Sequence, residues 1–381
     1  MTMLRYQVCS RCVMDTSDPD ITFDSEGVCN HCRTHEQVTA KQVFSGEDAR
    51  RRLEEIVDGI RKAGAGRNYD CLIGVSGGVD STYTAWLVKE LGLRPLAVHL
   101  DNGWNSNIAV QNIARTLDKL KIDLVTHVID WEEYRDIQRA FLLASVPDVE
   151  VPTDHAILAC LYGASKKHRI GSILSGHNDQ TESHLPRAWS QGHIDYGYIH
   201  DIHARYGSGR VKTFPHLNYI DYIQHVRFGT EAVYILNYVD YTREKALDLI
   251  QGELGWEDYG GKHHESVFTR WYQGCYLPRK FGFDKRRTHL SSLVSTGQMR
   301  REAALAALQP PPYDELQQEE DCVYVAKKLG FTEEEFVGIM TSPPKRFSDY
   351  NSYAKRIDTG AMRAFRDLRR NVRARFAGAL K

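Results

Sequence analysis

The sequence lacks an apolar run long enough to cross a bilayer, for which a helix needs about 20 predominantly apolar residues. It also lacks an excess of positive charge, because 49 lysines and arginines face 50 aspartates and glutamates, giving a formal net charge of −1. A large nucleic-acid surface usually brings a basic excess, so the balance argues against that class of partner. The first residues contain no apolar signal region. We therefore expect a cytoplasmic protein with no membrane span.

Cysteine occurs at eight positions, and four of them form two close pairs. Cys9 and Cys12 make one Cys-x-x-Cys pair, and Cys29 and Cys32 make a second pair sixteen residues later. Cytoplasmic thiols stay reduced, so these pairs indicate metal ligands rather than disulfides. Each pair can hold one side of a tetrahedral zinc ion, and a short segment with few apolar residues needs such a metal to fold. We predict a structural zinc ribbon at residues 1–45, with an iron–sulfur site as the minority alternative.

The other four cysteines are scattered, and we interpret them as small core residues: Cys71, Cys160, Cys275 and Cys322.

Apolar runs and helical segments alternate in the middle of the chain. The runs predict five strands, at about 69–76, 94–101, 123–129, 171–178 and 232–241. The segments between them have helical periodicity, as in Val110, Ile113, Leu117 and Leu120. This alternation is typical of an α/β fold, here a five-stranded parallel sheet with helices on both faces.

Three parts of the chain follow from these patterns: a zinc ribbon at 1–45, an α/β domain at 46–255 and a helical C-terminal region at 256–381. Thr332 and Glu335 have the spacing of a capping box in the last region. The segment 363–376 carries six arginines, and we interpret it as a solvated helix face because aromatic residues are sparse there. We expect the C-terminal region to bind substrate or a partner.

A glycine turn stands where the first strand gives way to a helix, in the stretch "CLIGVSGGVDSTYTAWLVKELG". Such a turn is an anion cradle, because backbone N–H groups and the helix N-terminus point at the ligand. Ser76 and Ser81 can donate hydrogen bonds to phosphate oxygens, and Gly77 and Gly78 allow close approach. Asp80 repels phosphate, so it either caps the helix or holds a magnesium ion that the phosphates share. An ordinary strand–helix turn is the alternative, but five matching positions favour the cradle.

The stretch "SGGVDS" resembles the S-G-G-x-D-S pyrophosphate loop of the PP-loop ATPases, such as asparagine, NAD and GMP synthetases and tRNA-thiolating enzymes. The resemblance continues over about residues 66–270 through "AVHLDNGW", "LSGHNDQTE" and "GGKHHES". It implies cleavage of ATP between the α- and β-phosphates, adenylation of a carbonyl oxygen and displacement of AMP by a nitrogen or sulfur nucleophile. It also implies ATP contacts at Asp101, Gly176 and His177. Asp101 could equally start a turn, and His177 could be a local hydrogen-bonding residue.

A narrower resemblance covers nearly the whole chain. The stretches "CSRCVMDTSDPDITFDSEGVCNHC", "VHLDNGWNSNIAVQNI" and "ASVPDVEVPTDHAI", and the segment that begins "GGKHHESVFTRW", are similar to the N-acetyl sugar amidotransferases. Members of that family make acetamidino groups on sugars of O-antigens and flagellar glycans. The resemblance implies that ATP activates the acetamido carbonyl of a nucleotide-linked or acidic sugar and that ammonia displaces AMP. An amide is a poor electrophile, and adenylation turns its oxygen into a leaving group.

The lysine-bearing stretch supplies further candidates for this chemistry. Lys262 is our candidate cation for the transferring phosphates, with an ordinary surface lysine as the alternative. Glu265, His263 or His264 is the candidate general base for ammonia. Arg286 and Arg287 are candidates for holding the carboxylate or diphosphate of the sugar, and a solvated charged run is about equally consistent with their sequence.

The nitrogen donor has to come from elsewhere. The N-terminal residues Met1-Thr2-Met3 and the stretch "WYQGCYLPR" fit neither of the two common glutaminase patterns. The resemblance to the N-acetyl sugar amidotransferases implies a separate glutaminase subunit that supplies ammonia, often with a barrel-type partner that conducts it.

Two other functions remain open on the sequence. One is a PP-loop tRNA sulfurtransferase, which neutral charge and the lack of a paired catalytic cysteine arrangement disfavour, since only Cys160 lies near a suitable place. The other is a non-enzymatic zinc-ribbon adaptor with a degenerate ATPase domain, which the intact glycine turn disfavours.

Overall fold

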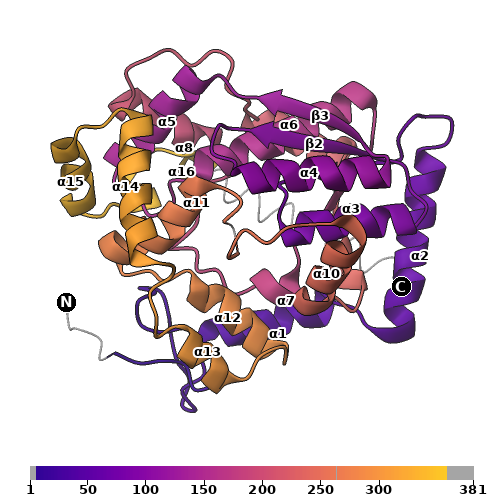
Figure 1. Cartoon of the computed structure of the whole chain (residues 1–381), viewed down its shortest axis with the longest axis horizontal. Helices are drawn as coiled ribbons and strands as arrows, with labels where there is room; N and C mark the ends of the chain where they lie inside the picture. Colours follow the sequence, from indigo (N-terminus) through magenta and orange to yellow (C-terminus); the bar gives the residue numbers. More distant parts are fainter. Residues whose placement is uncertain (1–5, 263, 358–381) are drawn as a thin grey trace.

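The centre of the protein is a parallel sheet. The structure is a computed structural model that describes residues 6–262 and 264–357 (Figure 1). Within these residues five strands pair in the order β3-β2-β1-β4-β5, and every pairing is parallel. The strands are β1 (Cys71–Gly74), β2 (Pro95–Asp101), β3 (Asp123–Val128), β4 (Ser172–Ser175) and β5 (Glu231–Tyr234). The α/β fold predicted from the sequence is confirmed.

The inner strands are apolar on both faces because helices cover both. In β1, Cys71 and Ile73 pack into one core, whereas Leu72 between them packs into the other. This explains why the strand is a continuous apolar run rather than an alternating one. β3 forms an edge of the sheet and is mostly exposed.

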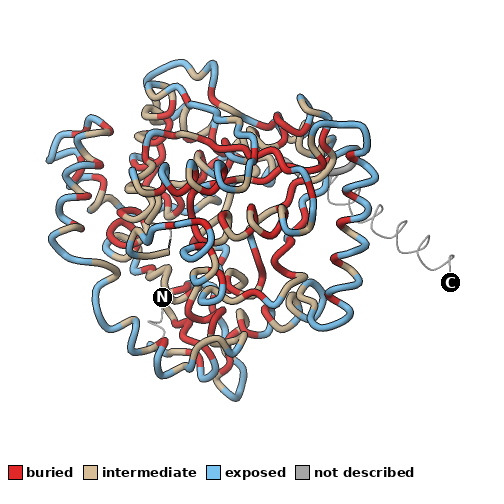
Figure 2. Tube along the Cα trace, turned by 45° about the vertical axis from the view of Figure 1, so that its right-hand side comes forward, coloured by how far each residue is buried: buried red, intermediate tan, exposed pale blue. Residues whose placement is uncertain are grey.

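Helices from distant parts of the sequence cover the two faces. One face is covered by α2 (Gly46–Ala63), α3 (Val79–Glu90), α4 (Asn107–Leu120), α10 (Arg243–Leu249) and the π-helix η2 (Ile250–Leu254). The other face is covered by α6 (Val151–His168) and α9 (Tyr219–Phe228). Figure 2 shows the buried residues concentrated in the interior and on the inner faces of these helices.

The remaining helices form a second layer of structure beside the sheet. They are α5 (Trp131–Leu143), α7 (Asp179–Glu182), α8 (Tyr196–Tyr206), α11 (Val267–Trp271), the π-helix η3 (Tyr272–Phe281), α12 (Arg286–Ser295), α13 (Arg301–Ala307), α14 (Glu315–Leu329), α15 (Glu333–Thr341) and α16 (Tyr353–Ile357). Short 3-10 helices occupy Ile235–Tyr238 and Phe347–Asp349. The predicted capping box at Thr332 and Glu335 is present at the start of α15.

The C-terminal helices share their core with helices from the middle of the chain. Phe141 of α5, Ile199 of α8, Trp271 of α11 and Phe336 of α15 belong to one buried apolar cluster. We keep the division into residues 1–45, 46–255 and 256–381 as a proposal. The shared core nevertheless ties the last part to α5 and α8.

The cysteine-rich N-terminal segment leads into α1 (Asn30–Gln42) and docks on α12 and α13 (Figure 1). The Arg301 guanidinium donates hydrogen bonds to the carbonyls of Cys9, at 2.6 Å, and Cys12, at 3.0 Å. Arg287 donates to the carbonyl of Val13, at 2.7 Å. Backbone carbonyls of the segment are thus satisfied by arginines from residues far along the chain.

Several local expectations differ from the structure. The apolar run 232–241 forms a strand only to Tyr234 and then a 3-10 helix, because Asn237 exchanges hydrogen bonds with Asp179 and so bends the chain toward α7. The helix that follows this segment, α10, continues as a π-helix from Ile250. Val110 is 49% exposed, although Ile113 and Leu117 of the same predicted face are buried.

None of the helices in residues 6–262 and 264–357 has the length and apolar content to cross a bilayer. The arginine-rich segment 363–376 lies outside the described residues.

Candidate functional site

The glycine turn lies between β1 and α3 and is held by its own serines. The Ser76 backbone N–H donates to Ser81 Oγ, at 3.3 Å, and the two hydroxyls are 3.2 Å apart. The Gly78 N–H donates to Ser76 Oγ, at 3.2 Å, and Gly78 is the N-cap of α3 without a capping side chain. The N-terminus of a twelve-residue helix therefore opens toward the turn, as an anion site requires.

Two glycines permit close packing around the turn. Gly77 has φ +79°, and a Cβ there would lie 2.4 Å from the carbonyl oxygen of Ala109 in α4. A Cβ on Gly176, after β4, would lie 2.9 Å from the carbonyl oxygen of Asp80. β1 and β4 are neighbours at the point where the strand order reverses, which is the place where open α/β sheets bind ligands. The turns after these two strands therefore meet at the expected ligand position.

A network of charged side chains stands at the mouth of the turn. Glu182 of α7 places one carboxylate oxygen 2.9 Å from Lys262 Nζ and the other 2.5 Å from His177 Nδ1. Lys262 Nζ is also 3.8 Å from Asp80 Oδ2, and the Tyr241 hydroxyl donates to Asp80 Oδ1. The structure thus brings together Asp80, His177 and Lys262, three residues singled out in the sequence.

The electrostatics of this network keep a positive charge at the turn. Burial lowers the pKa of Lys262, but Glu182 and Asp80 outweigh burial, so its net pKa lies above the ordinary value. His177 behaves in the same way. Burial lowers its pKa, but the hydrogen bond with Glu182 outweighs burial, so its net pKa lies above the ordinary value. Burial and the neighbouring Asp80 carboxylate raise the pKa of Tyr241, which stays a hydroxyl donor.

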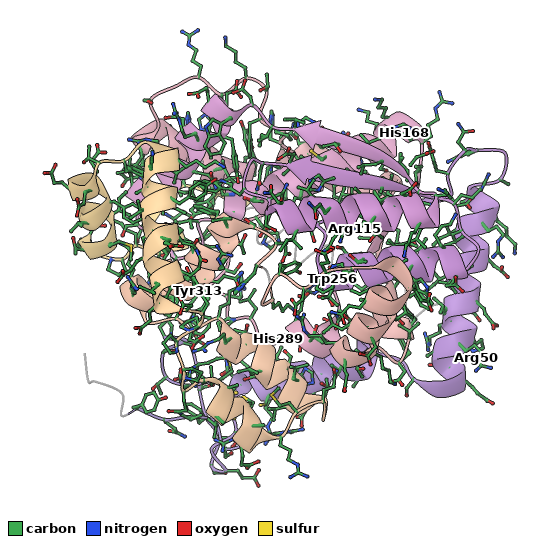
Figure 3. The ribbon with its side chains drawn as sticks, viewed as in Figure 1. Arg50, Arg115, His168, Trp256, His289 and Tyr313 are labelled. Atoms are coloured by element: carbon green, nitrogen blue, oxygen red, sulfur yellow. The ribbon has the colours of Figure 1, made fainter. Side chains whose placement is uncertain are left out.

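The segment between η2 and α11 carries Lys262 over the turn. The Trp256 indole donates to the Gly77 carbonyl, at 2.9 Å, and the Glu257 N–H donates to Asn112 of α4, at 2.9 Å. Farther along, the Ser106 N–H donates to the Glu265 carbonyl, at 2.8 Å. Figure 3 labels Trp256 just below α3 and His289 on α12. The segment is therefore fixed to the sheet domain at both ends.

A cavity of about 840 Å³ opens from the glycine turn. Its inner part is lined by Ser76 and Ser81 of the turn and by Val98 and Leu100 of β2. Its outer part is lined by the first turns of α6 and by residues of α11, η3 and α12. A space of this size, with polar groups at one end and apolar side chains along its wall, is typical of a small-molecule site.

The predicted general bases lie near the turn. Glu265 lines the cavity, and its Oε1 would lie 3.3 Å from a Cβ at Gly78. The Tyr259 hydroxyl donates to Glu265, and burial together with this carboxylate raises the pKa of Tyr259. His264 also lines the cavity, whereas His263 lies outside the described residues.

Three predicted ligand-binding residues have other partners. Asp101 Oδ1 accepts a hydrogen bond from the Gly103 N–H, at 3.0 Å, which is the turn-forming alternative, and its neighbours Leu100 and Asn102 line the cavity instead. Arg287 contacts Asp15, at 3.0 Å, and holds the N-terminal segment. Arg286 reaches the cavity wall, but its guanidinium binds Asp284 and carbonyls near α13.

Several side chains of the site were not singled out in the sequence. Glu182 lies within the quoted stretch "LSGHNDQTE", but nothing local distinguishes it from other acidic residues on helices. Tyr241 and Arg243, which lies at the turn's mouth, follow β5 and reach the site only through the sheet order. The pairing of strands, rather than a local motif, brings these residues together.

The four N-terminal cysteines form a compact, buried cluster. Their Sγ atoms all lie within 4.8 Å of one another, with 3.7 Å between Cys12 and Cys29 and 3.9 Å between Cys9 and Cys32. A tetrahedral zinc ion with Zn–S bonds of about 2.3 Å would separate its sulfurs by about 3.8 Å. Backbone N–H groups of Cys12 and Cys29 point at Cys9 Sγ, at 3.4 and 3.3 Å, as thiolates require. The donor set fits a closed, structural zinc site.

Two of the scattered cysteines are in contact. Cys275 Sγ in η3 and Cys322 Sγ in α14 are 3.2 Å apart, and the Trp271 indole donates to Cys322. Cys71 is buried in β1, as expected of a core residue.

The sheet order, the glycine turn and the charged network define a PP-loop α/β domain, joined to a four-cysteine ribbon and a helical C-terminal region. Residues 265–365 match the family model described as LPS biosynthesis protein WbpG-like, C-terminal domain. This segment follows the PP-loop domain along the chain and is similar to that C-terminal domain.

Other comparisons give more distant similarities. The chain is 29% identical over 144 residues to tRNA(Ile)-lysidine synthase of Chlamydia pneumoniae, covering 34% of this chain and 41% of the relative. It is 29% identical over 119 residues to a protein of Methanocaldococcus jannaschii, covering 31% of this chain and 41% of the relative. The chain thus spans about two fifths of the length of these curated relatives.

Two solved structures show weak overall similarity. NMN synthetase from Francisella tularensis aligns with a TM-score of 0.29 and 14% identity, covering 60% of this chain and 93% of that one. NH3-dependent NAD synthetase from Campylobacter jejuni aligns with a TM-score of 0.31 and 12% identity, covering 78% of this chain and 98% of that one.

Proposed function

We propose that the protein is an ATP-dependent amidotransferase that converts the acetamido group of an N-acetyl sugar into an acetamidino group. The main support for the proposal is a single cavity that is lined both by the PP-loop turn and by residues of the WbpG-like segment 265–365. Its inner end is a PP-loop turn with Lys262 above it, and its outer wall includes residues of the WbpG-like segment, such as Thr269 and Lys285. The first wall suits nucleotide phosphates, and the second belongs to a domain named for LPS biosynthesis.

The residues at the turn have separate roles in this reaction. Ser76, Gly77, Gly78 and Ser81 hold the pyrophosphate end of ATP, and Lys262 stabilises charge as that group departs. The Asp80 side chain is 23% exposed and faces the same space, so it suits a magnesium ion shared with the phosphates. Gly176 and His177 border the phosphates from the turn after β4.

The chemistry has two steps. The acetamido oxygen attacks the α-phosphorus of ATP, and pyrophosphate leaves, which gives an adenylated imidate. Ammonia then attacks the imidate carbon, the C–O bond breaks, AMP leaves with the oxygen, and proton loss from nitrogen gives the amidine. Glu265, beside the turn, is positioned to accept that proton, with His264 as the neighbouring alternative.

We further propose that ammonia comes from a separate glutaminase, together with a barrel-type subunit that conducts it. The support is the sequence resemblance and the need for a nitrogen donor. The single chain should use ammonium and should not use glutamine. Glutamine-dependent amidation by the purified chain, without ammonium, would contradict this part and leave the rest standing.

The reaction can be tested directly. The protein is incubated with ATP, Mg²⁺, ¹⁵N-ammonium and a panel of UDP-linked N-acetyl and diacetamido hexoses. We expect AMP, pyrophosphate and a sugar in which ¹⁵N–H has replaced one amide oxygen. ADP with orthophosphate would refute the PP-loop mechanism. AMP formation that needs tRNA and a sulfur donor would favour the sulfurtransferase alternative.

A further inference from the structure

One face of α6 runs along the cavity from the sheet outward. Leu161, Ile157, Asp154, Thr153 and Glu150 all line the cavity and recur at helical spacing. Leu161 lies at the inner end, where its methyl groups would be 3.8 Å from a Cβ at Gly74 of β1. With a rise of 1.5 Å per residue, Asp154 is about 10 Å and Glu150 about 16 Å farther out along the helix. The face therefore runs from the end of β1 to the outer end of the cavity.

The outer end of this face carries two interacting carboxyl groups. Burial, with repulsion from Asp154, raises the pKa of Glu150 to about 8, and burial, with repulsion from Asp148, raises the pKa of Asp154 to about 7. Glu150 accepts a hydrogen bond from the Thr269 hydroxyl on α11. The Asp154 side chain is open to the cavity. Such a pair can both accept and donate hydrogen bonds at neutral pH.

A lysine from another wall faces the carboxyl pair. Lys285, at the N-cap of α12, lines the cavity, and its Nζ lies 5.4 Å from the centre of the Tyr272 ring. Its charge attracts both carboxyl groups and partly offsets the rise in their pKa values.

The same cavity contains exposed apolar side chains. Ile157 is 37% exposed and Leu185 is 40% exposed, and both line the cavity. Large apolar side chains that stay open inside a cavity with convergent polar groups are typical of a surface meant for a ligand. This observation is independent of the charged cluster.

These features together limit the chemical class of ligand that the cavity can bind. The carboxyl pair disfavours a phosphate, and Lys285 disfavours a free cation. The apolar floor disfavours a ligand that is polar on all sides. A carbohydrate ring fits, because its C–H face is apolar and its edges carry hydroxyl or amide groups that donate and accept hydrogen bonds.

We propose that Glu150, Asp154 and Lys285, above the floor formed by Ile157 and Leu185, hold the carbohydrate ring of the acceptor. The inference rests on the proposed function and assigns it an acceptor subsite. The acetamido arm then points along α6 toward the turn, where the α-phosphorus of ATP would be presented. The subsite is made jointly by α6 of the PP-loop domain and α12 of the WbpG-like segment.

Binding and turnover test the subsite separately. Saturation-transfer NMR with UDP-N-acetylglucosamine and UDP-linked diacetamido hexoses measures sugar binding without chemistry. We expect transfer from protein methyl groups to the ring protons, and loss of most of it in Ile157→Ala. In Asp154→Asn and Glu150→Gln we expect acceptor Kd or KM to rise about 10- to 100-fold, because a polar group of the sugar is left in the cavity without its hydrogen-bond partner. KM for ATP should stay within about twofold, because the proposed subsite holds the sugar and not the nucleotide.

Asp118→Asn is the matched control, because Asp118 is an exposed acid on α4 outside the cavity. Circular dichroism and ATP binding establish that each variant is folded. Equal sugar binding by the wild type, Asp154→Asn and Glu150→Gln would overturn the subsite and leave the proposed function intact. No sugar binding by the wild type would also overturn it. Sugar binding that depends on these residues, with no amidine formed, would support the subsite and refute the proposed function.

Discussion

Glu182 and Lys262 form an ion pair at the mouth of the PP-loop turn, with 2.9 Å between Oε1 and Nζ. Glu182 also binds His177 through its other oxygen, so one carboxylate orients two groups that face the anion site. Neither partner is fully buried, since Lys262 is 17% and Glu182 21% exposed. The lysine is therefore held in place but keeps access to a ligand.

The first prediction concerns Lys262. Lys262→Met should lower pyrophosphate release by about 10²- to 10³-fold, because it removes a preorganised charge from the departing phosphates. Lys245→Met is the matched control, since Lys245 is exposed on α10 and pairs with Asp240. We expect the control to keep wild-type activity. Equal activity of the Lys262 variant and the control would contradict a role for Lys262 at the phosphates.

The second prediction concerns Gly77. Gly77→Ala should destabilise the protein by more than about 1 kcal/mol, because its φ is +79° and the new Cβ meets the Ala109 carbonyl at 2.4 Å. The shift of α4 should also abolish ATP binding. Gly163→Ala in the interior of α6, where nothing lies within 4 Å, should instead stabilise by about 0.5 to 1 kcal/mol. Chemical denaturation and nucleotide titration of both variants measure the difference, and similar behaviour of the two would show that the turn tolerates a side chain.

Local patterns were predictable from the sequence, whereas contacts between distant residues were not. The Thr332–Glu335 capping box depends on four consecutive residues and was found correctly. The alternation of strands and helices predicted the α/β class, because the side chains of each segment that face the core are apolar and recur with the period of its secondary structure. The pair Glu182–Lys262 joins residues eighty positions apart, and only the sheet order brings them together.

The same distinction explains the details that the sequence leaves open. Asp101 has two possible roles on the sequence; its Oδ1 accepts the turn-forming hydrogen bond from the Gly103 N–H, and its contact with ATP stays a prediction. The strand predicted at 232–241 ends early, since Asn237 bonds to Asp179, a residue beyond the reach of any local pattern. The contact between Cys275 and Cys322 likewise depends on the packing of η3 against α14.

The third prediction is a pH dependence at Asp136 of α5. Its carboxylate accepts hydrogen bonds from the Ser208 and Gly209 backbones and from the Ser208 hydroxyl, and it pairs with His203. Burial raises its pKa, but these hydrogen bonds outweigh burial and lower it to about 2. Because the folded pKa lies below the unfolded one, the carboxylate stabilises the fold above about pH 4 and loses this effect as pH falls toward 2.

Asp136→Asn should therefore lose about 2 kcal/mol of the free energy of unfolding at neutral pH. The difference from the wild type should shrink as pH falls from about 4 to 2. Denaturant titrations over this range check both effects, with Asp118→Asn as the exposed control. A difference that stays constant with pH would mean that Asp136 acts through packing alone.

The fourth prediction concerns the zinc ribbon. Metal analysis of the purified protein should find one zinc per chain, bound by Cys9, Cys12, Cys29 and Cys32. Cys29→Ser should lose the metal, whereas Cys160→Ser, on a cysteine far from the cluster, should keep it. Iron with sulfide in place of zinc would overturn the assignment and favour the iron–sulfur alternative.

Zinc loss should also affect the candidate site at the PP-loop turn, because α1 packs on α7, which carries Glu182. His35 Nδ1 is 2.5 Å from Ser183 Oγ, and the His35 and His184 rings are 4.8 Å apart. Ser183 follows Glu182 directly, so disorder in the ribbon would release the carboxylate that holds Lys262. Stripping the metal with a chelator should lower both the thermal midpoint and pyrophosphate release, and added zinc should restore them together. A lowered midpoint with unchanged turnover by the remaining folded protein would show that the ribbon stabilises the chain without positioning the site.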